Sequence, residues 1–417
     1  MKIALVSPYD YAYPGGVTSH ITQLYHHFVE AGHDVRIIAP SSQPQETFDN
    51  PDVIVCGTPM SIPASGSIAR ITLSLRLASR VKEMLANEHF DVVHLHEPLM
   101  PMLTLTFLRF SKAVNVGTFH AHRDSSLAYL YGRRLLKRWF RRLDGKIAVS
   151  RPAMDFVSTY FQGYYNIIPN GINLDHFNPE VEPLPEFNDG KFNILFVGRF
   201  EQRKGLRYLV RAYARLKEEM PETRLIIVGP DGGMRARYEK SITKAGLQDV
   251  VFSGFVSYED LPRYYRSAHI FCTPATGQES QGIVLLEALA CGTPVVASNI
   301  EGFASVITHG EEGLLVPPKD EEKLAMALVH LLADTDLRES MSERGVITAQ
   351  SYAWKRVSSQ VLSYYYRLLQ AKHAVHPPSD TPPTPKKRRS SWRSMLTSLP
   401  KRGSSFLLRS RNNVPRN

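Results

Sequence analysis

Cysteines and long apolar runs are both scarce in this 417-residue sequence. The three cysteines, Cys56, Cys272 and Cys291, have no metal-type spacing, which argues against a disulfide framework and against a cysteine metal site. No apolar run approaches the roughly 18 residues of a membrane-spanning helix. The first ten residues have the pattern of a β-strand, not of a signal peptide. We therefore expect a cytoplasmic protein.

Acidic residues are also in deficit, with 40 Asp and Glu against 50 Lys and Arg. Most of the excess positive charge lies beyond Pro377, where Asp380 is the one acid among many lysines and arginines. The rest of the chain is nearly neutral. A neutral body argues against a nucleic-acid-binding protein, for which the basic tail would be the only support.

Two series of β-strand and helix patterns follow each other along the chain. The first begins at Lys2–Ser7, and the second begins near Phe192 after an acidic, proline-rich linker at 178–188. This α/β pattern predicts two Rossmann-like domains facing across a cleft. We expect domains at 1–180 and 190–352, a helix at 353–372 that returns to the first domain, and a disordered basic tail at 373–417.

The stretch Phe271–Ser298 carries the strongest chemical signal. A short strand leads to a loop with Glu279 and Gly282, and a helix starts near Ile283 and carries Glu287 in an otherwise apolar run. The free N–H groups of a helix start favour an anion. A buried carboxylate needs a partner. A ligand with both phosphate and hydroxyl groups suits this arrangement.

The pattern E-S-x-G-x-x-x-x-E, followed by A-x-A-x-G-T-P-V-V-A-S, resembles the signature of retaining nucleotide-sugar glycosyltransferases of the two-domain GT-B class, family 4. One departure is Gln281, where the family usually has an aromatic residue. The resemblance implies that Glu287 binds the nucleotide ribose and Glu279 the transferred sugar. It also implies donor contacts from Gly282 and Ile283, and from Gly16 in the loop P-G-G-V.

Two cations and a histidine extend the donor site. Arg199 and Lys204 lie between a strand end and a helix, in the pattern G-R-x(4)-K-G, and this spacing suits a diphosphate; Arg203 reads as a surface charge. His120 lies just beyond the carboxyl end of a strand, where ligands bind in α/β sheets. By resemblance, His120 hydrogen-bonds the sugar near the reacting carbon. We assign no nucleophile.

Within the family the chain is most similar to phosphatidyl-myo-inositol mannosyltransferases, through SPYD-x(3)-PGGV-x-SH, IPASGSIAR, DVVHLHEP and GTFHAH. This similarity implies GDP-mannose as donor and phosphatidyl-myo-inositol or a related lipid as acceptor. It assigns Tyr9, Ser67 and Arg70 to the acceptor. We expect a loop at 62–67 and a helix at about 68–87 that begins near Arg70. A UDP-sugar donor with a soluble or other lipid acceptor is the alternative.

No catalytic metal or other cofactor is expected. The sequence contains one D-x-D pattern, Asp334–Asp336, and we interpret it as a turn far from the glycine loops.

Two segments are candidates for an anionic membrane surface. The tail combines Lys386–Arg389 with a Trp392 and leucine stripe, which predicts a peripheral anchor on the inner face of the plasma membrane. The basic helix expected at 132–144 is either a surface for headgroups or a solvated helix that packs Leu135, Trp139 and Leu143 inward.

Overall fold

The computed structural model describes residues 1–13, 15–64, 67–72, 77–123 and 125–375. The tail prediction from Lys386 onward lies outside this part of the chain. Within the described residues, none of the helices combines the length and the apolar character that crossing a membrane requires.

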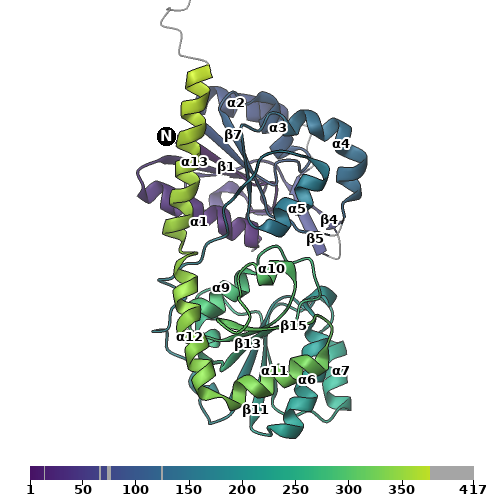
Figure 1. The fold of residues 1–417 in the computed structure, drawn as a ribbon. Coiled ribbons are helices and arrows are strands. Elements are labelled where there is room, and N and C mark those ends of the chain that lie inside the picture. Colours follow the sequence, from purple (N-terminus) through teal and green to yellow (C-terminus); the bar gives the residue numbers. More distant parts are fainter. Residues whose placement is uncertain (14, 65–66, 73–76, 124, 376–417) are drawn as a thin grey trace, which may run out of the picture.

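Two parallel sheets form the centres of two halves, stacked one above the other in Figure 1. Their central strands are apolar and buried because helices cover the sheets, as parallel sheets require. The first sheet has the order β3-β2-β1-β6-β7-β8-β9 and the second β12-β11-β10-β13-β14-β15. The strands of the first sheet are β1 (Lys2–Val6), β2 (Asp34–Ala39), β3 (Val53–Val55), β6 (Val92–His96), β7 (Val114–Phe119), β8 (Gly145–Ala148) and β9 (Asn166–Ile167). Those of the second are β10 (Phe192–Val197), β11 (Thr223–Val228), β12 (Val250–Gly254), β13 (Ile270–Thr273), β14 (Val295–Ser298) and β15 (Gly313–Val316).

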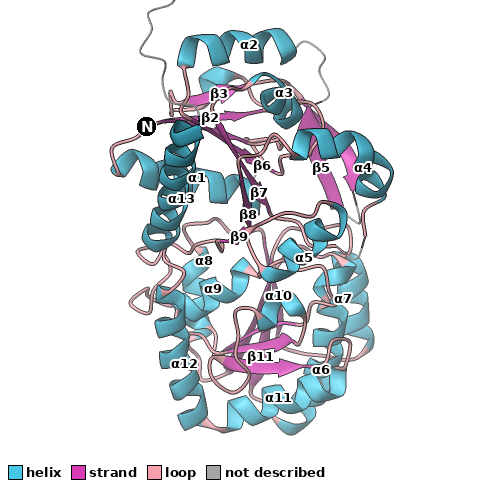
Figure 2. Cartoon of the chain, turned by 45° about the horizontal axis from the view of Figure 1, so that its top comes forward, coloured by secondary structure: helices cyan, strands magenta, loops and turns pink. Residues whose placement is uncertain are grey.

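The helices follow the strands in both halves (Figure 2). In the first half they are α1 (Gly16–Glu30), α2 (Leu77–Glu88), α3 (Leu103–Phe110), α4 (Leu127–Phe140) and α5 (Arg151–Tyr160). In the second half they are α6 (Leu206–Glu219), α7 (Arg235–Lys244), α8 (Leu261–Ser267), α9 (Ile283–Ala290), α10 (Glu301–Ala304), α11 (Glu321–Ala333) and α12 (Thr335–Gln350). Short 3₁₀ turns lie at Gln45–Thr47, Pro185–Phe187 and Gln202–Lys204.

The strand orders locate a binding region before any side chain is considered. In the first sheet the order reverses between β1 and β6, and in the second between β10 and β13. Ligands of open α/β sheets bind beyond the carboxyl ends of the strands at such a reversal. The loops after β1, β6, β10 and β13 are therefore the ones to inspect.

Helix α13 (Trp354–Val375) returns to the first half, as the sequence predicts, and Figure 1 shows it running along that half. The Tyr364 hydroxyl accepts the N–H of Lys146 at 3.1 Å, and the Tyr365 hydroxyl lies 2.5 Å from His94 Nδ1. Tyr365 is fully buried. The two-domain expectation, with a last helix crossing back to the first domain, is confirmed.

One expected element is wrong. The segment expected as a loop and then a helix from Ile68 forms an antiparallel hairpin, β4 (Pro59–Ala64) and β5 (Ser67–Thr72). Helix α2 begins later, at Leu77. Met60 pairs with Ile71 and Ser61 pairs with Arg70 across the two strands. β-Branched residues in this segment favour a strand. Arg70 is thus a strand residue.

The basic helix also differs from expectation. It spans Leu127–Phe140, and Leu135, expected to pack inward, is 67% exposed. Leu143 packs into the core as expected, and Trp139 is partly buried against it. Phe140 packs into the same core in place of Leu135.

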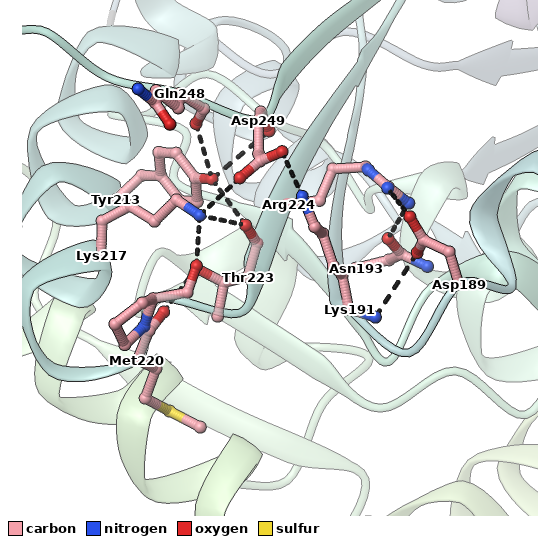
Figure 3. A network of polar contacts seen from close by, with 11 residues as sticks. Asp189, Lys191, Asn193, Tyr213, Lys217, Met220, Thr223, Arg224, Gln248 and Asp249 are labelled. Atoms are coloured by element: carbon pink, nitrogen blue, oxygen red, sulfur yellow. Dashed lines mark hydrogen bonds and ion pairs between the residues drawn. The ribbon is translucent and has the colours of Figure 1, made fainter.

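A polar network lies at the amino ends of the strands of the second sheet, opposite the carboxyl ends where ligands are expected (Figure 3). Asp249 binds the ammonium groups of Lys191 at 2.5 Å and Lys217 at 2.7 Å, and Arg224 binds Asp189 and Asn193. These residues lie around the amino ends of β10 and β11. The network therefore braces the sheet on the side away from the ligand-binding edge.

Candidate active site

The starts of two helices from different halves lie side by side. A side-chain carbon placed on Gly16, at the start of α1, would lie 3.7 Å from Ile283 Cδ1, at the start of α9. The capping residues of both helices, Gly15 and Gly282, offer no side-chain cap. Gly282 has φ +84°, and a Cβ there would meet Phe303 at 2.7 Å, so the position requires glycine. Two sets of unpaired N–H groups thus meet in one place, which suits an anion.

A cluster of opposite charges lies beside these helix starts. Glu279 Oε1 is 2.7 Å from Lys204 Nζ and 2.5 Å from Arg203 Nη1, and its side chain is 12% exposed. Burial by itself raises the pKa of Glu279, but the charges of Lys204 and Arg203 outweigh it and hold this pKa below its ordinary value. Arg203 also binds Glu201 at 2.8 Å. It is thus part of the site, contrary to the sequence interpretation.

Arg199 lies at the more open side of this cluster. Its guanidinium is 3.7 Å from Glu201 Oε1, and its side chain is 45% exposed. Lys204 is followed by Gly205, which has φ +74° and packs against the Pro274 carbonyl. This close packing fixes the backbone position from which the Lys204 side chain extends. Arg199 and Lys204 therefore stand on the same loop as two cations of different exposure.

Glu287 lies on α9 and receives a hydrogen bond from the Tyr265 hydroxyl at 2.7 Å. Burial raises its pKa to about 7, although the hydrogen bond from Tyr265 and the charge of Lys204 act in the opposite direction. Tyr265 is fully buried. A carboxylate held in this way can accept hydroxyl groups of a ligand once ionised.

Three histidines of the first half come together around His120. His120 Nε2 lies 3.0 Å from His96 Nδ1, and the His20 ring stands edge-on to His120 with centroids 4.8 Å apart. Burial is the main reason that the pKa of His120 lies well below its ordinary value, and the nearby imidazoles lower this pKa further. The backbone N–H of His120 donates to Glu97 Oε1 at 2.7 Å. His120 is therefore a neutral imidazole held at the carboxyl end of β7.

These histidines also form a group with potential metal ligands. One ring nitrogen from each of His20, His96 and His120 lies within 4.8 Å of the others. Because His96 and His120 already share a hydrogen bond, we assign no metal to them. The D-x-D pattern is not a turn: Asp334 caps α12 by accepting the N–H of Leu337 at 2.9 Å. That transfer needs no catalytic metal remains a prediction.

The proposed acceptor residues meet across a short backbone pairing. Tyr9 forms an antiparallel bridge with Ile71, and the N–H of Asp10 donates to the Arg70 carbonyl at 3.0 Å. The Arg70 guanidinium lies 3.5 Å above the centre of the Tyr13 ring. Ser67 pairs with Ala64 at the end of the hairpin. Tyr9 and Arg70 are thus brought together, with Tyr13 as a neighbour that the sequence did not indicate.

The structure also shows a bridge between the halves that sequence reasoning missed. Gln281, 2% exposed, binds Asn170 of the first half through three hydrogen bonds. Asn170 in turn binds His20 Nδ1 at 2.9 Å. The one feature of the sequence that could have indicated this contact is Gln281 itself, which stands where the family usually has an aromatic residue.

Two family models match the chain. Residues 14–176 match "Glycosyltransferase Family 4" and residues 179–346 match "Glycosyl transferases group 1". A phosphatidyl-myo-inositol mannosyltransferase of Mycobacterium leprae is 37% identical over 371 residues, covering 88% of this chain and 96% of that protein. A D-inositol 3-phosphate glycosyltransferase of Arthrobacter sp. is 29% identical, covering 84% of this chain and 90% of that protein.

Solved structures share the fold. Sucrose-phosphate synthase from Thermosynechococcus elongatus has a TM-score of 0.71 at 24% identity, over 89% of this chain and 99% of that one. Anabaena HepE in complex with UDP has a TM-score of 0.72 at 20% identity, over 88% and 100%. The identity to the mannosyltransferase, its coverage and the two matched models lead to one conclusion: the chain is a GT-B glycosyltransferase and belongs to glycosyltransferase family 4.

Proposed function

We propose that this protein transfers mannose from GDP-mannose to phosphatidyl-myo-inositol with retention of anomeric configuration. The observation that carries the proposal is the meeting of two uncapped helix starts with the Lys204–Glu279 pair. A nucleoside diphosphate needs N–H donors and cations, and a sugar needs carboxylate acceptors. Both kinds of group are present here within one small region.

Each residue takes a role that its surroundings support. Arg199 and Lys204 stabilise the charge that grows on the diphosphate as the sugar leaves. Glu279 binds hydroxyls of the sugar, and Glu287 binds the ribose. His120, neutral because burial depresses its pKa, donates a hydrogen bond to the sugar and adds no positive charge beside a reacting carbon that itself becomes cationic. We assign no nucleophile.

The acceptor proposal depends on Arg70 and on the relatives. Arg70 provides a guanidinium for the phosphate of an inositol headgroup, with the Tyr13 ring beneath it. The names of the Mycobacterium leprae mannosyltransferase and of the D-inositol 3-phosphate glycosyltransferase both contain a phosphate-linked inositol. The alternative is a UDP-sugar donor with a soluble acceptor, and the UDP complex of the HepE structure keeps it worth testing.

The test is a transfer assay with labelled sugars. GDP-mannose, other GDP-sugars and UDP-sugars are offered with phosphatidyl-myo-inositol in detergent or with inositol phosphate in water. We expect label in the lipid from GDP-mannose, with α-linked mannose by NMR of the product. Transfer only from a UDP-sugar, or only to inositol phosphate, would establish the alternative. A β-linked product would refute retention.

We further infer that the protein works as a peripheral enzyme on an anionic membrane, and that α4 makes the contact. Leu127, Tyr131 and Leu135, spaced by four residues, are 67%, 83% and 67% exposed. Exposed cations lie among and just beyond them, namely Arg133, Arg134, Lys137, Arg138, Arg141 and Arg142. An apolar stripe among cations is the pattern of a helix that lies in the plane of an anionic bilayer surface. Figures 1 and 2 both show α4 beside β5, the strand that carries Arg70.

Liposome sedimentation tests this contact. We expect the double variant Leu127→Ser, Leu135→Ser to bind phosphatidylglycerol liposomes several-fold more weakly than the wild type. Ile347→Ser, a change at a 65% exposed position of α12, is the matched control. Binding should fall with salt. If the double variant binds normally and removal of the chain from Pro377 abolishes binding, the tail is the anchor and α4 is not.

A further inference from the structure

The contact between the two halves at Gln281 ends on the histidine cluster. Gln281 lies between Glu279 and Gly282 in the loop before α9. Its Oε1 accepts the backbone N–H of Asn170 at 2.7 Å and Asn170 Nδ2 at 2.9 Å, while its Nε2 donates to the Asn170 carbonyl at 3.2 Å. Every polar atom of the Gln281 amide is thus used on one residue of the other half.

This pairing decides which way the Asn170 amide faces. Because Nδ2 donates to Gln281, Oδ1 is the atom that faces His20, and it lies 2.9 Å from His20 Nδ1. An amide oxygen only accepts, so His20 Nδ1 must carry the proton. Burial lowers the pKa of His20 to about 4, so the ring is neutral and has a single N–H. Nε2 of His20 is therefore left as an acceptor.

His20 borders the proposed sugar site. Its ring contacts His120 edge-on at 4.8 Å between centroids and Trp354 at 5.0 Å. His20 is 4% exposed, and Asn170 is 6% exposed. Because both side chains are buried, a turned Asn170 amide or the other His20 tautomer would leave a buried polar atom without a partner.

We propose that Gln281 is a positioning residue: by binding Asn170 it fixes the tautomer and direction of His20, and it thereby couples the docked donor loop to the histidines beside the sugar. The proposal rests on the proposed function for the identity of that sugar site. An aromatic side chain, usual in the family at this position, cannot form these hydrogen bonds. The coupling therefore belongs to this chain's own Gln281.

Three variants test the proposal in transfer assays. Gln281→Met keeps the length of the side chain and removes its hydrogen bonds. Asn170→Ala removes the hydrogen bond between Asn170 and His20, at the other end of the same series of hydrogen bonds. Ser280→Ala removes a different contact between the halves, the 3.2 Å hydrogen bond between Ser280 and Ser150, and serves as the control.

We expect Gln281→Met and Asn170→Ala each to lower kcat roughly tenfold, because both weaken or remove the one hydrogen bond that orients His20. The donor KM should change less than about twofold, and the double variant should be no slower than the slower single one. Ser280→Ala should keep the wild-type kcat. A wild-type kcat in Gln281→Met, or losses that multiply in the double variant, would overturn the coupling.

A second readout needs no activity. Nitrogen chemical shifts of ¹⁵N-histidine-labelled full-length protein report which ring nitrogen of His20 carries the proton. We expect the Nδ1–H form in the wild type and in Ser280→Ala, and a mixture of tautomers in Gln281→Met. If Gln281→Met does not fold, Asn170→Ala gives the same answer. Unchanged shifts in either variant refute the proposal, whereas a wild type that transfers no sugar refutes only the proposed function.

Discussion

Replacing Glu287 by Gln should make the protein more stable at high pH while it weakens donor binding. Glu287 is a carboxyl group in an apolar helix whose hydrogen-bond donor is the Tyr265 hydroxyl. Burial raises its pKa from 4.5 to about 7. The fold therefore holds this group more easily as the neutral acid than as the carboxylate.

The size of the effect follows from the pKa shift. One pKa unit corresponds to about 1.4 kcal/mol, so the rise sets an upper limit of about 3 kcal/mol on the cost of ionising Glu287 in the fold. Because Glu287 is half-buried, water screens part of this cost and reduces it to about 2 kcal/mol. Because the folded-state pKa is the higher one, the stabilisation is complete below pH 4.5 and is lost as the pH rises through about 7.

Urea unfolding at pH 5 and pH 8 measures this difference. At pH 8 we expect Glu287→Gln to have a free energy of unfolding about 2 kcal/mol above the wild type, and at pH 5 the two should be close. Glu301→Gln, at an exposed position of α10, controls for the change in net charge. Calorimetry with GDP should show at least tenfold weaker binding, because Gln offers one acceptor oxygen where the ribose hydroxyls need two. Equal destabilisation at both pH values would refute the argument.

Three further outcomes test other parts of the site. Glu279→Gln should lose most transfer while keeping its fold, because it removes the carboxylate assigned to the sugar; near-normal turnover in a folded variant would contradict that role. Arg70→Ala should raise the acceptor KM or lower kcat with little change in GDP affinity by calorimetry, and loss of nucleotide binding would move Arg70 to the donor side. Gly205→Ala should destabilise the second half by at least about 2 kcal/mol in urea, since φ is +74° and a Cβ would overlap the Pro274 carbonyl; an unchanged midpoint would refute the strain.

The two-sheet architecture and the loops that carry the site could be predicted from local sequence. Apolar strands alternating with amphipathic helices specify parallel sheets, and local patterns such as the glycine before Ile283 and the cations after Val197 depend only on neighbours in the chain. The exception was the segment after Ile62. There a helical pattern competed with strand pairing, and the partner strand could not be known from local sequence.

The contacts between side chains far apart in the sequence could not be predicted and became visible in the folded protein. Arg203 has the sequence context of a surface charge, and it is the contact with Glu279, 76 positions along the chain, that makes it part of the site. Asn170 and Gln281 are 111 positions apart, and His20 and Asn170 are 150 apart. Spacing in sequence carries no information on such pairs. The Arg203–Glu279 and His20–Asn170 contacts depend on how each half folds, and the Asn170–Gln281 contact depends on how the two halves dock. The chemistry of each loop was therefore local, while the coupling between donor loop and histidines is a property of the docked halves.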